Sequence, residues 1–392
     1  MATYGSHPPR CQSELKRHSS FEGKQMPGNS HVVVVGAGII GASLAWHLVR
    51  AGARVTIVEA GAAGGVATSN SFGWLNASWG NPEPYFRLRI RSMTEWRRLE
   101  REVPGLPVSW SGGLIWDLPP DKLADFAREH AAWGYGIRSV DRKEAARLEP
   151  QLADAPEFVL HVAEEGVAEP LATSRALMAA AVAAGAKLLE GRSVTSIRIG
   201  THGVSGVETD AGPIEADMVA VAAGVETPSM LATAGVKLPL STPPGMLVVS
   251  RPHRRLLDGL VMAPELHMRQ TADGRLVAGG DFEGNVPSKN IAAAAATLFS
   301  AMQRMLRAGE ELSLERHLLG HRPVPGDGFP AVGAASGVEG LYVAVMHSGM
   351  TLAPAVGRFL AEEMLGGRRE PLLSPYGLER FAGVEASAST TV

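Results

Sequence analysis

The segment from His31 to Val58 constrains the fold more than any other part of the sequence. Val32–Val35 are four consecutive β-branched residues, which is typical of a short strand buried on both faces. Glycines follow, Ala42–Arg50 predicts a helix, and Arg54–Val58 predicts a second apolar strand. Because a strand–helix–strand unit places its two strands in one parallel sheet, the sequence predicts an α/β fold.

The turn between this first strand and its helix has the pattern G-x-G-x-x-G, with Gly36, Gly38 and Gly41. The first glycine permits the tight turn, the second lets a pyrophosphate approach the backbone, and the third allows the helix to pack closely on the strand. The helix N-terminus, with Ile39 and Ile40, offers free N–H groups to phosphate oxygens. Since the motif follows a strand and opens a helix, it predicts a dinucleotide site.

An acidic residue ends the second strand. Glu59 lies 23 residues after Gly36, close to the spacing of about 20 at which such an acid accepts hydrogen bonds from a ribose diol. Its charge would repel a 2′-phosphate, which disfavours NADP, and we expect the adjacent Ala60 to line the same site. These residues do not distinguish NAD from FAD.

Composition narrows the function classes. The 392 residues carry a net charge of −3, so no strong field draws the chain to nucleic acid or anionic lipid. Cys11 is the sole cysteine, which rules out an internal disulfide and fits a reducing compartment; we expect a cytoplasmic protein without a metal site. No apolar run reaches the roughly 18 residues of a transmembrane helix. Residues 1–30 are polar, and we expect a disordered extension there.

The order of elements predicts a discontinuous domain. Nucleotide-type strand and helix patterns occur at the start, middle and end of the chain, and β-rich stretches lie between them. We therefore predict a segmented Rossmann-like domain with an inserted antiparallel β-sheet domain. The predicted first domain comprises 31–80, 160–235 and 320–370, the second comprises 81–159 and 236–319, and 371–392 form a C-terminal tail.

Three segments carry a family resemblance. They are 64–73 (GGVATSNSFG), 320–333 (GHRPVPGDGFPAVG) and 340–357 (GLYVAVMHSGMTLAPAVG). Together they resemble the D-amino acid oxidase family of FAD flavoproteins, which includes glycine oxidase, sarcosine oxidase and D-amino acid dehydrogenase. The similarity extends over roughly His31 to Gly367, and its two C-terminal segments are the most specific part.

The resemblance implies an FAD enzyme that oxidises a C–N bond. An amino acid, N-substituted amino acid or amine would lose a hydride to flavin N5, and the resulting imine would hydrolyse. Oxygen or another electron acceptor would take the electrons. D-hydroxyproline and opine-type compounds stay open as substrates, as do oxidase against dehydrogenase activity and the oligomeric state. No cysteine follows Cys11, which excludes a cysteinyl flavin link; a histidyl link stays open.

The resemblance also implies the residues that hold the cofactor. Thr68 and Ser69 match a loop that contacts the FAD phosphates, with a simple hydroxyl-capped turn as the alternative. Val194 matches a position whose backbone meets the adenine, and Ala223 and Gly224 match a second close approach. The pyrimidine edge of the flavin would face a helix N-terminus, which stabilises negative charge there. The residues of this N-terminus are Gly349, Met350, Thr351 and Leu352.

On the substrate side, Arg322 matches an arginine that grips a substrate carboxylate, for which its planar, permanently charged head is suited. The alternative is an ion pair with an acid such as Asp327. His347 could serve as a base or hydrogen-bonding group, or only support the site. His267 and Arg269 are two apart on a predicted strand, so they share a face that could bind a polar substrate tail or simply be solvated.

Several aromatic, histidine and arginine residues have two possible roles. Phe72, Trp74 and Trp79 would line the flavin pocket or belong to the core, and His321 lies beside the predicted arginine clamp. Arg87, Arg91 and Arg98 predict a solvated helix face. Two other functions stay open: a flavin-binding subunit of a heteromeric dehydrogenase, without chemistry of its own, and an NAD-dependent dehydrogenase, which would leave the C-terminal motifs unexplained.

Overall fold

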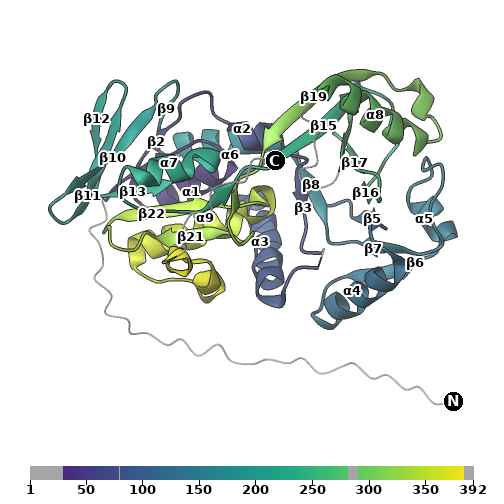
Figure 1. Ribbon diagram of the computed structural model, residues 1–392, viewed down its shortest axis with the longest axis horizontal. Coiled ribbons are helices and arrows are strands. Elements are labelled where there is room, and N and C mark those ends of the chain that lie inside the picture. Colours follow the sequence, from purple (N-terminus) through teal and green to yellow (C-terminus); the bar gives the residue numbers. More distant parts are fainter. Residues whose placement is uncertain (1–29, 79, 281–289, 384–392) are drawn as a thin grey trace, which may run out of the picture.

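A computed structural model describes residues 30–78, 80–280 and 290–383 (Figure 1). The predicted N-terminal extension, apart from Ser30, lies outside these residues, as do Cys11, Trp79 and positions 384–392. The predicted mixed α/β class is confirmed, with both parallel and antiparallel sheets. In the part of the chain that the structure describes, no helix is long and apolar enough to cross a membrane.

A six-stranded sheet forms around the glycine-rich turn. Strand β1 (His31–Val35) lies at its centre, parallel to β2 (Arg54–Val58) and β13 (Met218–Val221). The order is β21-β22-β13-β1-β2-β9, completed by β9 (Lys187–Leu189), β22 (Leu341–Val345) and the antiparallel β21 (Ala331–Ala334). Because all five residues of β1 are buried, the run of β-branched residues does form a central strand.

Helices from distant parts of the chain pack together on this sheet. They are α1 (Ile39–Arg50), α3 (Glu83–Glu102), α6 (Pro170–Ala183) and α9 (Gly349–Gly366), and α1 contacts both α6 and α9. The helix α9 begins at Gly349, so the residues expected at a helix N-terminus do lie in its first turn. Ser348 precedes the helix in a left-handed conformation with φ 58°, without a hydrogen bond from its side chain to the helix.

An eight-stranded sheet occupies the other half of the molecule (Figure 1). Its order is β19-β15-β18-β17-β16-β5-β7-β6, formed by β19 (Leu314–His321), β15 (Pro244–Ser250), β18 (Leu276–Gly279), β17 (His267–Gln270), β16 (Leu260–Met262), β5 (Gly113–Ile115), β7 (Val159–Val162) and β6 (Ile137–Val140). The expectation of an antiparallel sheet is wrong at one place, since β16 and β5 pair in parallel. This pair joins strands from the two segments assigned to the inserted domain.

Smaller elements complete the structure. One three-stranded sheet has β10 (Val194–Gly200), β11 (Gly203–Thr209) and β12 (Gly212–Glu215); another has β3 (Trp74–Leu75), β8 (Gly166–Ala168) and β4 (Val108–Ser109); β14 (Leu240–Ser241) pairs with β20 (Val324–Pro325). The remaining helices are α2 (Val66–Ser69), α4 (Pro120–Ala132), α5 (Arg142–Leu148), α7 (Thr227–Ala232) and α8 (Ile291–Arg304), with four short 3-10 helices, η1 (Gly224–Glu226), η2 (Gly309–Glu311), η3 (Pro371–Tyr376) and η4 (Leu378–Phe381).

The sheets bear on the predicted domain limits. The limit at 159/160 falls inside β7, and the limit at 319/320 falls inside β19; both strands belong to the eight-stranded sheet. The segment assigned to a tail does not begin as one, because Leu373 and Tyr376 of η3 and Leu378 of η4 are buried. Its apolar residues pack on the six-stranded sheet, which explains why the chain stays folded as far as η4.

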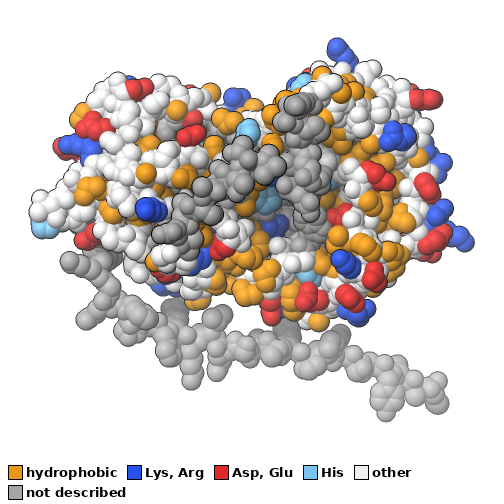
Figure 2. Space-filling view, viewed as in Figure 1, with side chains coloured by type: hydrophobic (Ala, Val, Ile, Leu, Met, Phe, Trp, Pro, Cys, Tyr) orange, Lys and Arg blue, Asp and Glu red, His pale blue; other side chains and the backbone are white. Residues whose placement is uncertain are grey.

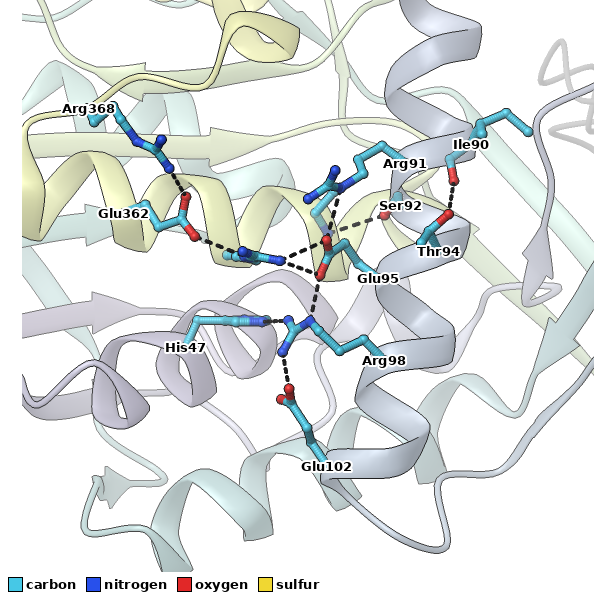
Figure 3. Close-up of polar contacts among 12 residues, drawn as sticks. His47, Ile90, Arg91, Ser92, Thr94, Glu95, Arg98, Glu102, Glu362 and Arg368 are labelled. Atoms are coloured by element: carbon cyan, nitrogen blue, oxygen red, sulfur yellow. Dashed lines mark hydrogen bonds and ion pairs between the residues drawn. The ribbon is translucent and has the colours of Figure 1, made fainter. Parts of the chain in front are cut away.

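A network of polar contacts on α3 reaches α9 through Arg358 and α1 through His47 (Figure 3). Glu95, 3% exposed, accepts from Arg91, Arg98 and Arg358. Burial acts to raise the pKa of Glu95, but the hydrogen bonds and charges of Arg98 and Arg358 outweigh it, so this pKa lies below its ordinary value. The predicted solvated face holds for Arg87 and Arg91, which are exposed and pair with Glu83 and Glu95 on the same helix. Arg98 instead is partly buried and hydrogen-bonds to His47 of α1.

Candidate active site

A large cavity of about 1520 Å³ is lined by residues of both main sheets. Its wall contains the glycine-rich turn and Glu59 of the first sheet, the start of α9, and residues of β15, β17 and β19 from the second sheet. The face shown in Figure 2 carries acidic and basic side chains intermixed. The chain brings segments from distant stretches of sequence to one cavity.

The glycine turn is required by contacts that no side chain could share. Gly36 has φ 103°, and a Cβ there would lie 2.6 Å from the carbonyl oxygen of Ala222. A Cβ on Gly41 would collide with the carbonyl of Gly36, so α1 can start this close to β1 only with glycine. Gly38, Ile39 and Ile40 line the cavity, whereas Gly41 does not.

A hydroxyl group stands at the N-terminus of α1. The oxygen of Thr68 accepts a hydrogen bond from the Ile39 N–H at 3.2 Å, which leaves the Thr68 O–H as a donor toward the cavity. The neighbouring Ser69 donates instead to the Val66 carbonyl at 3.0 Å, within its own turn. Helix dipole, free amides and the Thr68 hydroxyl together suit a phosphate group.

Glu59 is held rigidly at the end of β2. One carboxylate oxygen accepts the Ala37 N–H at 2.7 Å, and the other accepts the Gly61 N–H at 2.9 Å. Each oxygen keeps a free lone pair, which a ribose hydroxyl can use. Ala60, Val194, Ala223 and Gly224 line the same cavity as Glu59.

The first turn of α9 faces the cavity farther along. Gly349, Met350 and Thr351 line it, but Leu352 is fully buried behind the wall. The Thr351 hydroxyl donates to the Trp74 carbonyl at 3.0 Å and lies 3.3 Å from the Asn76 N–H, so it fixes the neighbouring loop. The backbone amides of this turn, rather than the Thr351 side chain, are available to a ligand.

These features fit FAD as a cofactor. The glycine turn makes room for a pyrophosphate, Glu59 for a ribose, and the N-terminus of α9 for a ring that becomes anionic. The enclosed space continues past α9 to the eight-stranded sheet. Its length leaves room for a second, smaller molecule.

Arg322 directly follows β19 and lies on the cavity wall. One terminal nitrogen donates to the Pro244 carbonyl at 3.0 Å, and the guanidinium covers Gly245, where a Cβ would lie 2.9 Å from that nitrogen. The alternative partner Asp327 is taken by Arg380, with two hydrogen bonds of 2.7 and 3.0 Å. Among the described residues, Asp327 is therefore the partner of Arg380 and not of Arg322.

His347 is half-buried and lies near two guanidinium groups. Burial first, and then the charges of Arg322 and Arg89, lower the pKa of His347 to about 4. The ring is consequently neutral at physiological pH, and its Nδ1 lies 3.3 Å from the Ser348 hydroxyl. A neutral ring can accept a hydrogen bond from an amine but cannot attract a carboxylate by charge.

His267 and Arg269, which were predicted to share a strand face, have different surroundings. His267 is buried, lines the cavity, and meets the Phe72 ring edge-on at 4.6 Å between centroids. Arg269 does not line this cavity; it donates to both oxygens of Glu169, at 2.8 and 3.1 Å, and to the Phe72 carbonyl. We do not include Arg269 in a substrate site.

Trp74 lines the cavity and is fixed from behind by a buried carboxylate. Its indole N–H donates at 2.7 Å to Glu165, which also accepts from the Tyr135 hydroxyl and from Ser78. Burial raises the pKa of Glu165, although these donors act against the rise. The sequence analysis missed Glu165, because nothing near it in the chain marks it as part of a site.

Arg89 is a second residue that the sequence analysis missed. It extends from α3 to the cavity wall and is 5% exposed. It donates to the Asn76 carbonyl at 2.9 Å, to the Asn76 side-chain oxygen, and to the Tyr85 hydroxyl at 3.3 Å. Arg89 belongs to a run of arginines on α3, so its type and spacing gave no signal of a special role.

His321 is exposed and lies 3.2 Å from the Thr242 carbonyl, also on the cavity wall. The described residues contain no group of three or more His, Cys, Asp or Glu side chains that could hold a metal ion. The described wall of the cavity thus offers arginine and histidine side chains rather than a metal-ligand cluster.

Comparison with known proteins agrees with this arrangement. Residues 31–363 match the family described as DAO, FAD dependent oxidoreductase. The chain is 29% identical to the uncharacterized oxidoreductase YurR of Bacillus subtilis, over 88% of this chain and 97% of YurR. It is 26% identical to the hydrogen cyanide synthase subunit HcnC of Pseudomonas aeruginosa, over 89% and 96% respectively.

A solved structure of glycine oxidase from Geobacillus kaustophilus superimposes with a TM-score of 0.80 at 26% identity, covering 90% of this chain and 99% of that one. The family that the three motifs indicated, the FAD cofactor and the oxidoreductase class are therefore confirmed.

Proposed function

Because this chain belongs to the DAO family of FAD-dependent oxidoreductases, we propose that it oxidises the C–N bond of an amino acid, an N-substituted amino acid or a related amine. The bound flavin supplies the oxidant, taking a hydride at N5, and the imine product hydrolyses in water. Oxygen or another electron acceptor completes the cycle. The observation that carries the proposal is the position of Arg322 and the neutral His347 on the wall of the cavity that begins at the glycine turn.

Arg322 is the proposed clamp for the substrate carboxylate. Its guanidinium presents parallel N–H groups, and the backbone acceptor at Pro244 fixes its orientation. Holding the carboxylate fixes the α-carbon, so that its hydrogen faces one direction only. The neutral His347 accepts a hydrogen bond from an N–H of the substrate and so orients the substrate nitrogen. His267 and Trp74 bound the same space and limit the substrate side chain.

We further propose that the six-stranded sheet and its helices form the cofactor domain and that the eight-stranded sheet forms the substrate domain. The nucleotide-end residues come from the former, whereas His267 comes from the latter and Arg322 directly follows it. The predicted limits then move so that β7 and β19 stay within the substrate domain.

Anaerobic reduction of the bound flavin tests the proposal. The yellow protein is mixed without oxygen with glycine, sarcosine, proline, D- and L-amino acids and simple amines, and its visible absorption is followed. We expect bleaching by amino acids that carry a free carboxylate and none by the matching decarboxylated amines. Bleaching by amines alone, with no effect of the carboxylate, would contradict the role of Arg322. Readmission of air then separates an oxidase from a dehydrogenase.

A second candidate function is a flavin-binding subunit of a heteromeric enzyme, and the similarity to HcnC, a synthase subunit, favours keeping it. In this case the isolated protein would hold FAD, yet no amine would bleach it until a partner chain is added. Turnover by the purified chain alone excludes this alternative.

A further inference from the structure

Arg89 is a buried cation without a carboxylate partner among the described residues. Its hydrogen-bond acceptors are the Asn76 carbonyl, the Asn76 amide oxygen and the Tyr85 hydroxyl, all of them neutral. These contacts use three of the five N–H donors of a guanidinium. Burying such a charge is unfavourable unless an anion compensates it, so the side chain is arranged for an anion that enters the cavity.

The surroundings of Arg89 locate that anion near the start of α9. Asn76, which accepts two hydrogen bonds from Arg89, also places its own N–H 3.3 Å from the Thr351 hydroxyl, in the first turn of the helix. Two further contacts hold α3 to α9: the Trp96 indole donates to the Met350 carbonyl at 2.9 Å, and the Ala355 N–H donates to Ser92 at 3.3 Å. The guanidinium and the positive end of α9 therefore act on neighbouring points of the cavity.

We propose that Arg89 stabilises the negative charge that the flavin ring gains on reduction, at its N1–C2=O edge. In the proposed site, α1 and Thr68 bind the phosphates of FAD, and Arg322 binds the substrate carboxylate. When the substrate C–H bond breaks, its electron pair and hydrogen form the new N5–H bond, and the added negative charge moves to N1 and the C2 oxygen. In this role Arg89 is a positioning residue that compensates charge. The inference rests on the proposed function, in which the flavin ring lies at the start of α9.

Sulfite affinity and reduction potential test Arg89 without any substrate. Sulfite forms a bond from its sulfur to flavin N5 and leaves the same negative charge at N1–C2=O. Replacing Arg89 by Met removes the charge but keeps an unbranched side chain, and Arg89→Lys keeps the charge. Arg87→Met is the matched control, because Arg87 lies on the same helix, pairs with Glu83 at the surface and does not line the cavity.

We expect Arg89→Met to weaken sulfite binding about 10- to 100-fold, as for loss of a charge-assisted hydrogen bond. An equal loss of stabilisation of the reduced flavin lowers its two-electron reduction potential by about 30 to 60 mV. Arg89→Lys is expected to retain most of the sulfite affinity, and Arg87→Met all of it. If Arg89→Met does not retain FAD, sulfite is added to the wild-type protein and to Arg89→Lys. The inference requires that sulfite bleach the flavin of the wild-type protein.

Three outcomes overturn the inference. They are a wild-type flavin that sulfite does not bleach, an Arg89→Met flavin with unchanged potential and sulfite affinity, and a rise in substrate KM with an unchanged potential, which would assign Arg89 to the substrate. Failure of the proposed function looks different, since a flavin that no amine reduces can still bind sulfite and be reduced electrochemically.

Discussion

The contact between α1 and α9 depends on one glycine, and replacing it makes a sharp test of the structure. Gly357 lies where α9 crosses Ser43 of α1. A Cβ at position 357 would lie 2.8 Å from the Ser43 carbonyl carbon and 3.0 Å from the Leu44 nitrogen. Both are backbone atoms, so no rotamer change can relieve the overlap. The Ser43 hydroxyl also donates to the Ala353 carbonyl at 2.7 Å and holds the helices at this separation.

The expected effect of Gly357→Ala is a balance of two terms. Overpacking a close contact costs about 1–3 kcal/mol, and replacing glycine by alanine within a helix returns about 1 kcal/mol. The variant should therefore lose up to about 2 kcal/mol of stability. Because α1 carries the glycine turn and α9 the amides expected at the flavin ring, FAD affinity should fall too, by up to roughly 30-fold for the same free energy.

Thermal unfolding and an FAD titration of the apoprotein measure these effects. Gly366→Ala is the matched control, since Gly366 ends the same helix with no atom within 4 Å of its added Cβ. This variant should be as stable as the wild type or slightly more stable, with unchanged FAD affinity. If Gly357→Ala behaved like Gly366→Ala in both assays, α1 and α9 could not lie as close as described.

Three other predictions follow from the site. Arg322→Lys should lower kcat/KM about 100-fold for carboxylate substrates, because an ammonium cannot form the paired hydrogen bonds. Steady-state kinetics should show no such loss for Arg316→Lys, since Arg316 lies on the preceding strand β19 with its side chain 48% exposed. Glu59→Gln should weaken FAD binding about 10-fold, since the amide cannot accept on both sides; an FAD titration tests this, with the half-exposed Glu208→Gln as control. Acid should destabilise the protein, because the pKa values of His47 and His347 are lowered from 6.5 to about 4. Burial is the main cause, with added repulsion from Arg98 for His47 and from Arg322 for His347. Both histidines are neutral when folded, so their stabilising contribution is complete above pH 6.5 and is lost as pH falls toward 4, by up to about 3 kcal/mol each. Unfolding of the wild type and His47→Gln at pH 7 and pH 4.5 measures this, and an equal loss in both proteins would exclude His47 as a cause.

Some of this protein can be derived from the sequence because the relevant forces are local. The β-branched run at Val32–Val35 and the glycines at Gly36 and Gly41 have one consistent solution, a buried strand turning sharply into a helix. Glu59 is placed by the length of that same unit. Each of these residues acts within one strand–helix–strand element, so spacing along the chain is enough to predict their positions relative to one another.

Tertiary structure alone decided what lies opposite these residues. Arg269 and His267 share a strand pattern, yet Glu169, about a hundred positions away in the chain, removes Arg269 from the cavity. Arg89 resembles its neighbouring arginines, and only the packing of α3 on α9 makes it the buried one. Burial and charge pairing depend on which distant segments meet. Local periodicity does not encode that choice, and the free energy of the whole assembled chain settles it.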